Sequence, residues 1–352
     1  MSEAATLTTE TAAPPIQLAA ALYGSAIFDL ADRTRIRVAG ADRLRWLNGM
    51  VSNAIQTLPE GHGNYNFILN AQGKIQGDAY IYRRAEDLIL DTDRPQAARL
   101  LAHLDHFIIM DDVELHPLDG STTGIGLMGP NSTDILDRLA LNASALGPLQ
   151  FTETSLNGAR ITLVHAYSVS IPRYELWFRP EDSARIHQAF AETSALHVDP
   201  ATVEAVRILQ GIPRYGTDIT DRHLAQETTQ TRALNFTKGC YLGQEIVERI
   251  RSRATVHRNL RQFSLEGTAT AVPADLRVVR DPAAVDSSAG DSSVVGQLTS
   301  FAPIQLPGFT QNFGIGFIRT EAVERAIALQ ASIEYDGGVA TVLDHPPTLP
   351  QP

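Results

Sequence analysis

The stretches IRVAGADRLRWLNGM (36–50) and IGLMGPNSTDILDRL (125–139) follow one plan. Each begins as a short strand with alternating apolar residues, turns at a glycine and continues as a helix with apolar side chains on one face. In the second stretch a proline suits the first helical turn, and the asparagine beside it suits a cap. The repeat predicts two related α+β units, over about residues 20–116 and 118–205.

The remaining segments differ in their pattern of apolar and turn residues. Residues 65–92 predict antiparallel strands joined by a tight turn, and residues 95–108 have the period of an amphipathic helix. Further helices are predicted over 181–193 and 201–211. After about residue 255, short strands alternate with turn residues, which is typical of a small all-β barrel or sandwich. The insert at 281–293 is expected to form a mobile surface loop.

These elements predict an α+β fold with three parts. A disordered tail is expected over residues 1–18, because Ala, Thr, Glu and Pro dominate it. Residues 19–255 would contain both α+β units and a further motif segment. Residues 256–352 would form the C-terminal β-barrel.

The composition excludes several classes of function. The chain of 352 residues has a formal net charge of −11, which makes it a poor general ligand for phosphate backbones and argues against nucleic acid. It has no apolar run of membrane-spanning length and no secretory signal, so we expect a cytoplasmic protein without a membrane partner. Its single cysteine excludes an internal disulfide, a multi-cysteine zinc site and an iron–sulfur cluster held by this chain alone.

That cysteine, Cys240, lies in KGCYLGQE (238–245). A thiol reacts as the thiolate, and its pKa falls near a cation or a helix N-terminus. Lys238 supplies a cation, a helix predicted from 244 supplies the N-terminus, and Gly239 and Gly243 allow a tight loop. The alternative is a buried cysteine that acts as a small hydrophobic residue. The residues alone leave both interpretations open.

Four other residues and one basic run have a functional and a structural interpretation. Arg207 could clamp a carboxylate or a heterocycle, or form a surface salt bridge. Asn70 and Asp78 could lie at the mouth of a hairpin, or the asparagine could simply shape its turn. Glu175 lies in a strand, and it needs a partner if it faces inward. The basic run at 249–261 could bind an anion or form a solvated face.

KGCYLGQE, followed by IVER, resembles the signature of the YgfZ-type folate-binding proteins, which are relatives of the glycine-cleavage aminomethyltransferase, or T-protein. The resemblance extends over four more stretches. The chain opening FDLADRTRIRVAGADRLRWLNGMVSN, the hairpin YNFILNAQGKIQGDAYIY, the segment VEAVRILQGIPRYGTDI and the barrel segment VVGQLTSFAPIQLPGFTQNFGIGFIR are all similar to that superfamily.

The resemblance implies two α+β units and a small barrel around a central folate pocket. By motif match, Glu175 and Arg207 would hold the pterin and neighbouring folate groups, with Tyr215 and Asn70 also binding the cofactor. Asp78 falls where T-proteins carry two acidic residues, one of them catalytic. A glycine precedes it in this chain, so one of those two carboxylates is missing.

The implied function is a tetrahydrofolate-binding accessory factor in iron–sulfur cluster assembly or repair, with carrier or client proteins as partners. Cys240 could lend one thiolate to a cluster shared with a carrier, or exchange with a sulfur species on a client, and Lys238 would tune it. The alternative is a folate-dependent aminomethyl or methyl transferase that uses Asp78 as its acid or base. A third possibility is a client-binding module in which folate is only structural.

Overall fold

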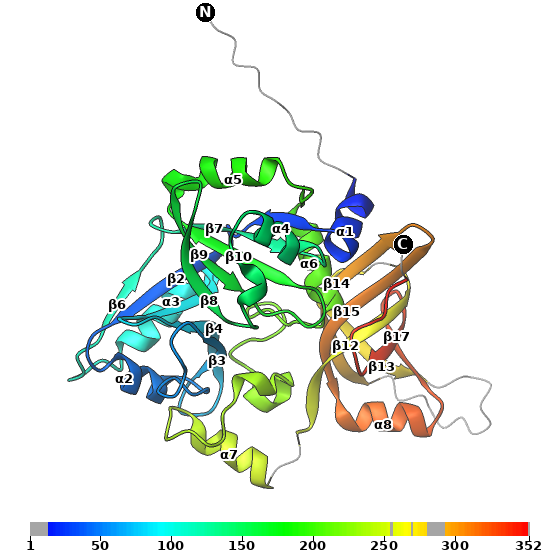
Figure 1. Cartoon of the computed structure of the whole chain (residues 1–352). Helices are drawn as coiled ribbons and strands as arrows, with labels where there is room; N and C mark the ends of the chain where they lie inside the picture. Colours follow the sequence, from blue (N-terminus) through cyan, green and yellow to red (C-terminus); the bar gives the residue numbers. More distant parts are fainter. Residues whose placement is uncertain (1–12, 254–255, 269, 280–292, 351–352) are drawn as a thin grey trace, which may run out of the picture.

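The structure is a computed structural model that describes residues 13–253, 256–268, 270–279 and 293–350. One antiparallel and one mixed β-sheet carry helices on their faces, and a closed barrel lies beside them (Figure 1). The predicted α+β fold with a C-terminal barrel is thus confirmed. Apart from its last residue, the insert predicted as a mobile loop lies outside the described residues.

The first sheet has five strands in the order β3-β4-β5-β2-β6. Its core contains Trp46 and Leu47 of α2 and Leu100 and Leu104 of α3. The elements are β2 (Arg33–Ala39), α2 (Arg43–Met50), β3 (Gly63–Leu69), β4 (Ile75–Arg83), β5 (Leu88–Asp93), α3 (Arg94–Asp105) and β6 (Glu114–Pro117).

The second sheet has six strands in the order β11-β1-β7-β10-β9-β8, and only the β1–β11 pair is parallel. A second core packs α4 and α5 on this sheet. The elements are β1 (Ala26–Asp29), β7 (Thr123–Met128), α4 (Ser132–Arg138), β8 (Phe151–Leu156), β9 (Ala159–His165), β10 (Arg173–Phe178), α5 (Ser183–Ala191) and β11 (Leu196–His197).

The repeated strand–glycine–helix plan appears as β2–α2 and β7–α4. The turn glycines, Gly40 and Gly129, both have a left-handed φ, and a Cβ at either position would collide with a backbone oxygen. Each glycine is therefore required by both conformation and packing.

Two details differ from the sequence interpretation. Strand β1 precedes the first repeat in the chain but pairs with β7 and β11, so it completes the second sheet. Residues 14–18 are helical rather than part of a disordered tail, because α1 (Pro14–Tyr23) begins at a proline that suits the first turn. Burial of Leu18 and Ala21 in the central core then holds this helix in place.

The barrel closes in the order β12-β15-β14-β13-β16-β17. Its elements are β12 (Arg258–Gly267), β13 (Ala274–Val279), β14 (Val294–Leu306), β15 (Phe309–Arg319), α8 (Thr320–Ala328), β16 (Ser332–Tyr335) and β17 (Gly338–Leu343). In chain order, α6 (Pro200–Leu209) and α7 (Gln244–Arg253) come between β11 of the second sheet and β12 of the barrel. Four short 3-10 turns occur at Ala143–Ala145, Pro180–Asp182, Ala225–Thr228 and Thr231–Ala233.

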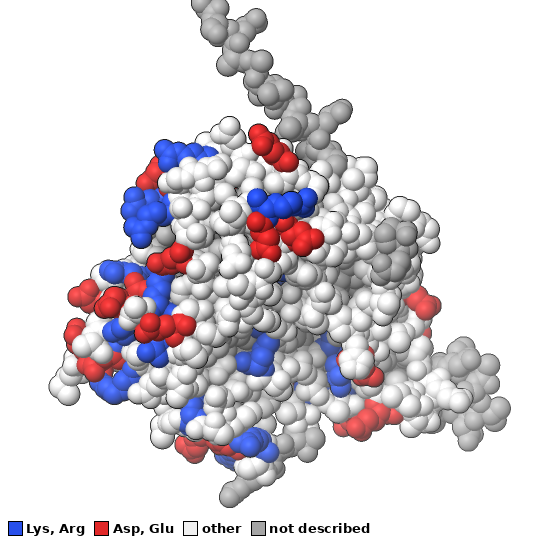
Figure 2. Space-filling view, in the orientation of Figure 1, with Lys and Arg blue, Asp and Glu red and all other residues white. Residues whose placement is uncertain are grey.

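Charged side chains of both signs are mixed over the region of α2 and β6, and they also lie together near α7 (Figure 2). Arg251 of α7, for example, pairs with Glu248 at 3.6 Å. The described part of the basic run therefore carries its own acidic partner. No helix in the described ranges is long and apolar enough to cross a membrane.

Candidate functional site

A cavity of about 590 Å³ lies where both sheets meet α6 and the segment that follows it. This volume is in the range of roughly 300–1,000 Å³ that is usual for small-molecule and cofactor sites. Asp78, Glu175 and Arg207, all candidates from the sequence, contribute to its wall. Other lining residues are Arg33, Tyr65, Tyr80, Asp91, Asp93, Tyr167, Arg173, Arg214 and Arg232.

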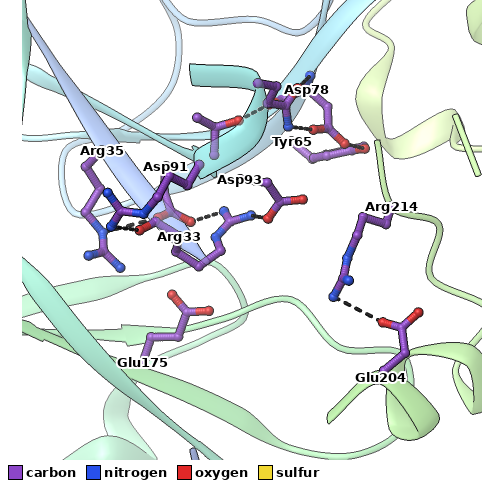
Figure 3. A network of polar contacts seen from close by, with 12 residues as sticks. Arg33, Arg35, Tyr65, Asp78, Asp91, Asp93, Glu175, Glu204 and Arg214 are labelled. Atoms are coloured by element: carbon purple, nitrogen blue, oxygen red, sulfur yellow. Dashed lines mark hydrogen bonds and ion pairs between the residues drawn. The ribbon is translucent and has the colours of Figure 1, made fainter. Parts of the chain in front are cut away.

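Paired charges on β2 and β5 form one end of the cavity. The strand register places Arg33 opposite Asp93 and Arg35 opposite Asp91. Arg33 donates to both Asp91 and Asp93, the latter at 2.6 Å, and it lies between Asp78 and Glu175 in Figure 3. Arg35 is only 2% exposed, ion-pairs with Asp91 at 3.2 Å and lies 4.4 Å from the centre of the Trp177 ring. Opposite charges directly across two strands stabilise the sheet and hold one another in place.

Glu175 on β10 projects toward this charged cluster (Figure 3). It accepts hydrogen bonds from Arg173 and from the Trp177 indole, each at 3.0 Å. Burial opposes its ionisation, but the nearby guanidinium groups of Arg173, Arg33 and Arg35 outweigh burial and hold the pKa of Glu175 below its usual value. Because a carboxylate has about four acceptor positions, Glu175 can still accept from a ligand.

Aromatic side chains form another part of the cavity wall. The Arg232 guanidinium lies 4.0 Å from the Tyr65 ring centre and 3.7 Å from that of Tyr167, and it donates to the Tyr80 hydroxyl at 3.0 Å. Tyr80 and Tyr167 stack with their centres 6.4 Å apart. This set of flat groups suits a planar heterocycle.

Asp78 on β4 is held from two sides. Tyr65 donates its hydroxyl to one carboxylate oxygen at 2.6 Å, and Gln96 donates its amide to the other at 2.7 Å. Burial raises the pKa of Asp78, and repulsion from Asp93 adds to that rise. A partly buried carboxyl with a raised pKa and a fixed orientation can exchange a proton with a bound molecule.

Arg207 reaches the cavity wall, but protein atoms occupy all of its N–H groups. It donates to Glu204 twice, to Asp218 at 2.7 Å, to the Ile212 carbonyl and to Ser300 at 2.7 Å. These bonds join α6, the loop after it and the barrel strand β14. In this arrangement Arg207 is a junction residue, and a role as a direct folate clamp stays a prediction that would need one of these bonds to break.

Asn70 and Tyr215 do not contribute to the cavity wall. The Asn70 side chain accepts from the amides of Gln72 and Lys74 and so shapes the hairpin turn. Tyr215 lies against Arg99, which donates to its hydroxyl. The structure therefore supports the turn-forming interpretation of Asn70, and cofactor binding by either residue stays a prediction.

Cys240 is exposed, which argues against the interpretation as a buried packing residue. Its neighbour Tyr241 is buried in a cluster with Phe67 and Val247, and this burial fixes the loop. The predicted downstream helix is α7, which begins at Gln244. Cys240 therefore lies at the outer end of an anchored loop, four residues before a helix N-terminus.

Lys238 anchors the same loop from inside. Its ammonium donates to the carbonyls of Asn48, Val51 and Asn53, each at 2.6 Å, at the C-terminal end of α2. Cations are favourable at a helix C-terminus because the carbonyls of the last turn have no hydrogen-bond partner within the helix. Burial lowers the pKa of Lys238 to about 7. The observed contacts thus give Lys238 a positioning role, and an effect on Cys240 stays a prediction.

The β3–β4 hairpin connects the cavity with the loop that carries Cys240 (residues 238–243), called the motif loop below. At its tip, a Cβ on Gly243 would lie 2.6 Å from the Asn70 carbonyl, and one on Gly73 would collide with Ile246. Asp78 lies four residues beyond Lys74 on the same hairpin, which is about 13 Å of extended strand. Cys240 does not line the cavity, so the exposed thiol and the cavity are separate.

The described residues contain no group of three or more His, Cys, Asp or Glu side chains that could hold a metal ion. The charge pairs between β2 and β5 and the tyrosine–arginine wall were not among the candidates from the sequence. The pattern RTR on one strand and DTD on another was a usable signal, because residues two apart in a strand share a face. Arg232 offered no such signal, since its aromatic partners are distant in sequence.

Comparison with known proteins agrees with this architecture. The chain is 23% identical over 331 residues to a putative chloroplastic transferase of Arabidopsis thaliana, covering 92% of this chain and 73% of that protein. It is 28% identical to a mitochondrial iron–sulfur cluster assembly factor IBA57 homolog of Pyricularia oryzae, and the match covers 66% of this chain and 55% of that protein. It is 24% identical to an aminomethyltransferase of Rubrobacter xylanophilus, and the match covers 68% of this chain and 65% of that protein. The chain thus spans 55% to 73% of the length of these relatives.

The fold matches the aminomethyltransferase T of the glycine cleavage system from Bartonella henselae, with a TM-score of 0.76, 17% identity and coverage of 94% of this chain and 88% of that one. The model of the GCVT N-terminal domain matches residues 18–238, well over half of the chain. Both sheets, the cavity between them and the start of the motif loop fall within that match, and the chain belongs to the GCVT N-terminal domain family.

Proposed function

We propose that this protein is a tetrahydrofolate-binding maturation factor for iron–sulfur proteins, of the YgfZ type, in which Cys240 acts together with a partner protein. The observation that carries the proposal is the pairing of two separate features. A cofactor-sized cavity offers an anionic acceptor beside an aromatic wall, and an anchored loop exposes the chain's one thiol outside that cavity.

The cavity residues fit a reduced folate. Glu175 can accept the N–H groups of a pterin, since its charge is held by surrounding guanidinium groups. Tyr65, Tyr80 and Tyr167 offer flat surfaces to the ring system and the adjoining aryl group. When bound, the folate would supply a one-carbon carrier. The protein residues would orient it and shield it from water.

The thiol fits a step shared with another protein. A cluster needs about four protein ligands, and this chain has one cysteine. Assembly-factor relatives support the proposal, since two fungal IBA57 homologs match about two thirds of the chain. Cys240 would then provide one thiolate to a cluster held mainly by a carrier, or exchange with a sulfur species on a client.

The test is in two parts. Calorimetry with 5-formyltetrahydrofolate should show one binding site per chain. In a strain that lacks this protein, the parent gene should restore the activity of cluster-dependent enzymes. Absence of folate binding would remove the cofactor role, and absence of rescue would remove the maturation role.

A second candidate is a folate-dependent aminomethyl or methyl transferase, favoured by the partly buried, oriented Asp78 in the cavity wall. Turnover of tetrahydrofolate with an aminomethyl donor, lost in Asp78→Asn, would support it. No product from the parent protein would exclude it.

A further inference from the structure

A second, smaller cavity adjoins the first one beside the end of α6 and the barrel. Its volume is about 230 Å³, and residues of β12, β15 and the segment at the end of β17 contribute to its wall. Tyr167, Gln210 and Ile212 line both cavities, so the two spaces meet at these three side chains. The second cavity is smaller than the roughly 300–1,000 Å³ that is usual for a complete ligand. It therefore suits an extension of the molecule that occupies the first cavity.

Gln210 presents an unused hydrogen-bond donor at the boundary of the two cavities. It is only 6% exposed, and its side-chain oxygen accepts from the backbone amides of Val169 and Ser170 at 2.8 and 3.3 Å. These two bonds fix which end of the side-chain amide is the oxygen. No described residue accepts a hydrogen bond from the NH₂ group at the other end. A buried polar group without a partner is costly, so this donor indicates a missing ligand atom.

Gln262 on β12 presents the complementary acceptor. It is 8% exposed, and its NH₂ group donates to the carbonyls of Ile208 and Leu209 at 2.7 and 2.9 Å. Its side-chain oxygen receives no hydrogen bond from the described part of the chain. A Cβ on Gly211 would lie 3.3 Å from that oxygen, which places the oxygen beside the residue that follows Gln210. The second cavity thus offers one amide donor and one amide acceptor at the same end of α6.

A cation lies in the same wall. Arg261 contributes to the second cavity, and its side chain is 39% exposed. Its ion pair with Asp344 is long, at 3.9 Å, and the Asp344 side chain is 85% exposed. An ion pair of this kind contributes little to stability, so the guanidinium can bind a carboxylate of a ligand instead.

We infer that the second cavity binds a γ-linked glutamyl chain on the folate, so that the protein selects polyglutamylated folates. This inference rests on the proposed function and names the form of its cofactor. Each added glutamate brings one amide N–H, one amide carbonyl and one carboxylate. Gln262 can accept from the N–H, Gln210 can donate to the carbonyl, and Arg261 can pair with the carboxylate.

The position of the second cavity agrees with the order of groups along a folate. Glu175 and the tyrosines of the first cavity suit the pterin and the adjoining aryl group. Tyr167 belongs to that aromatic wall and also lines the second cavity. A chain attached beyond the aryl group would therefore pass from the first cavity into the second at Tyr167.

The experiment compares three ligands by calorimetry on the full chain: 5-formyltetrahydrofolate with one glutamate, the same folate with three γ-linked glutamates, and free γ-linked triglutamate. The parent should bind the three-glutamate folate about tenfold or more tightly than the one-glutamate folate, because the added groups pair with a cation and two amides. Free triglutamate should bind far more weakly than the three-glutamate folate, because it lacks the ring system that holds the chain at the second cavity.

Two variants remove the groups that would hold the chain. Arg261→Gln removes the cation. Gln210→Glu keeps oxygen acceptors for the two backbone amides but replaces the unused donor by an oxygen. Each variant should reduce the preference for three glutamates to about threefold or less.

A third variant should act in the opposite direction. Asp344→Asn removes the anion that competes for Arg261 and should raise the preference by about twofold to fivefold. The matched control is Asp275→Asn, because Asp275 pairs with Arg277 at 3.2 Å on β13 and lines neither cavity. The control should keep the preference of the parent.

Equal binding of the two folates by the parent would overturn the inference and leave the proposed folate role intact. A preference that persists in both Arg261→Gln and Gln210→Glu, with melting temperatures like that of the parent, would overturn it as well. Free triglutamate that binds as tightly as the three-glutamate folate would show a peptide site independent of the cofactor and would also overturn it. If the parent binds neither folate, the proposed cofactor role falls together with the glutamyl site.

Discussion

Replacing Glu175 by glutamine should weaken folate binding without unfolding the site. The carboxylate uses two acceptor positions for Arg173 and Trp177, each at 3.0 Å, and leaves about two for ligand N–H groups. Arg173 and Trp177 donate to different oxygens of the carboxylate. Glutamine keeps only one of these acceptors and replaces the other by an amide donor, so it also loses the negative charge offered to the ligand. A hydrogen bond to a charged group is worth about 1.5–3 kcal/mol, so the Kd should rise by about 10- to 150-fold.

The assay is calorimetry of the parent and Glu175→Gln with 5-formyltetrahydrofolate, accompanied by thermal unfolding of both proteins. Glu153→Gln is the matched control, because Glu153 is exposed, lies outside the cavity wall and pairs with Arg84 at 3.0 Å. Because the pKa of Glu175 is held below its usual value, parental affinity should stay level from pH 7 to pH 5. Equal affinity of Glu175→Gln and parent, with both folded, would refute the assignment of the cavity.

Three other predictions concern the supports of the site. Lys238→Met removes three hydrogen bonds at the end of α2 and should lower the free energy of unfolding by about 2–4 kcal/mol in urea titrations, and an unchanged midpoint would contradict the anchoring role. His223 stacks on Phe317 with its ring centre 4.1 Å away, and burial, aided by Arg258, lowers its pKa to about 4. Between pH 6.5 and 4 the imidazole of His223 takes up a proton in the unfolded chain but not in the folded one. The free energy of unfolding should therefore fall by about 2–3 kcal/mol as pH drops through that window. A His223→Gln variant should lack this contribution to the pH dependence of stability. Asp78→Asn should leave the melting temperature at pH 7.5 equal or higher, because the raised pKa of Asp78 shows that its charge is costly there; a clear loss would mean that the charge stabilises the fold.

Local pattern predicted most of the fold because the elements are locally consistent. The alternating strand, turn glycine and amphipathic helix appear in both sheets, and all six barrel strands follow short apolar runs between turn residues. The failures involved tertiary pairing. Strand β1 joins the second sheet through contacts about 100 residues away, and α1 is stabilised by burial of Leu18 that its composition does not show.

The candidate site was predicted less completely, for the same reason. Asp78 and Glu175 do meet in one cavity, as the family resemblance implied. In sequence Arg207 could be a ligand clamp or form a surface salt bridge, whereas its partners Asp218 and Ser300 lie 11 and 93 residues further along the chain. The saturation of a buried arginine depends on such distant partners and is visible only in three dimensions.

The most direct test of the account compares Cys240→Ala with Glu175→Gln in a strain that lacks this protein. The readouts are the activity of a cluster-dependent enzyme in cells and the folate affinity of each purified variant. The account predicts that Cys240→Ala binds 5-formyltetrahydrofolate like the parent yet fails to restore enzyme activity, because the thiol lies outside the cavity. Full restoration by Cys240→Ala would contradict the central claim that the exposed thiolate acts in cluster maturation.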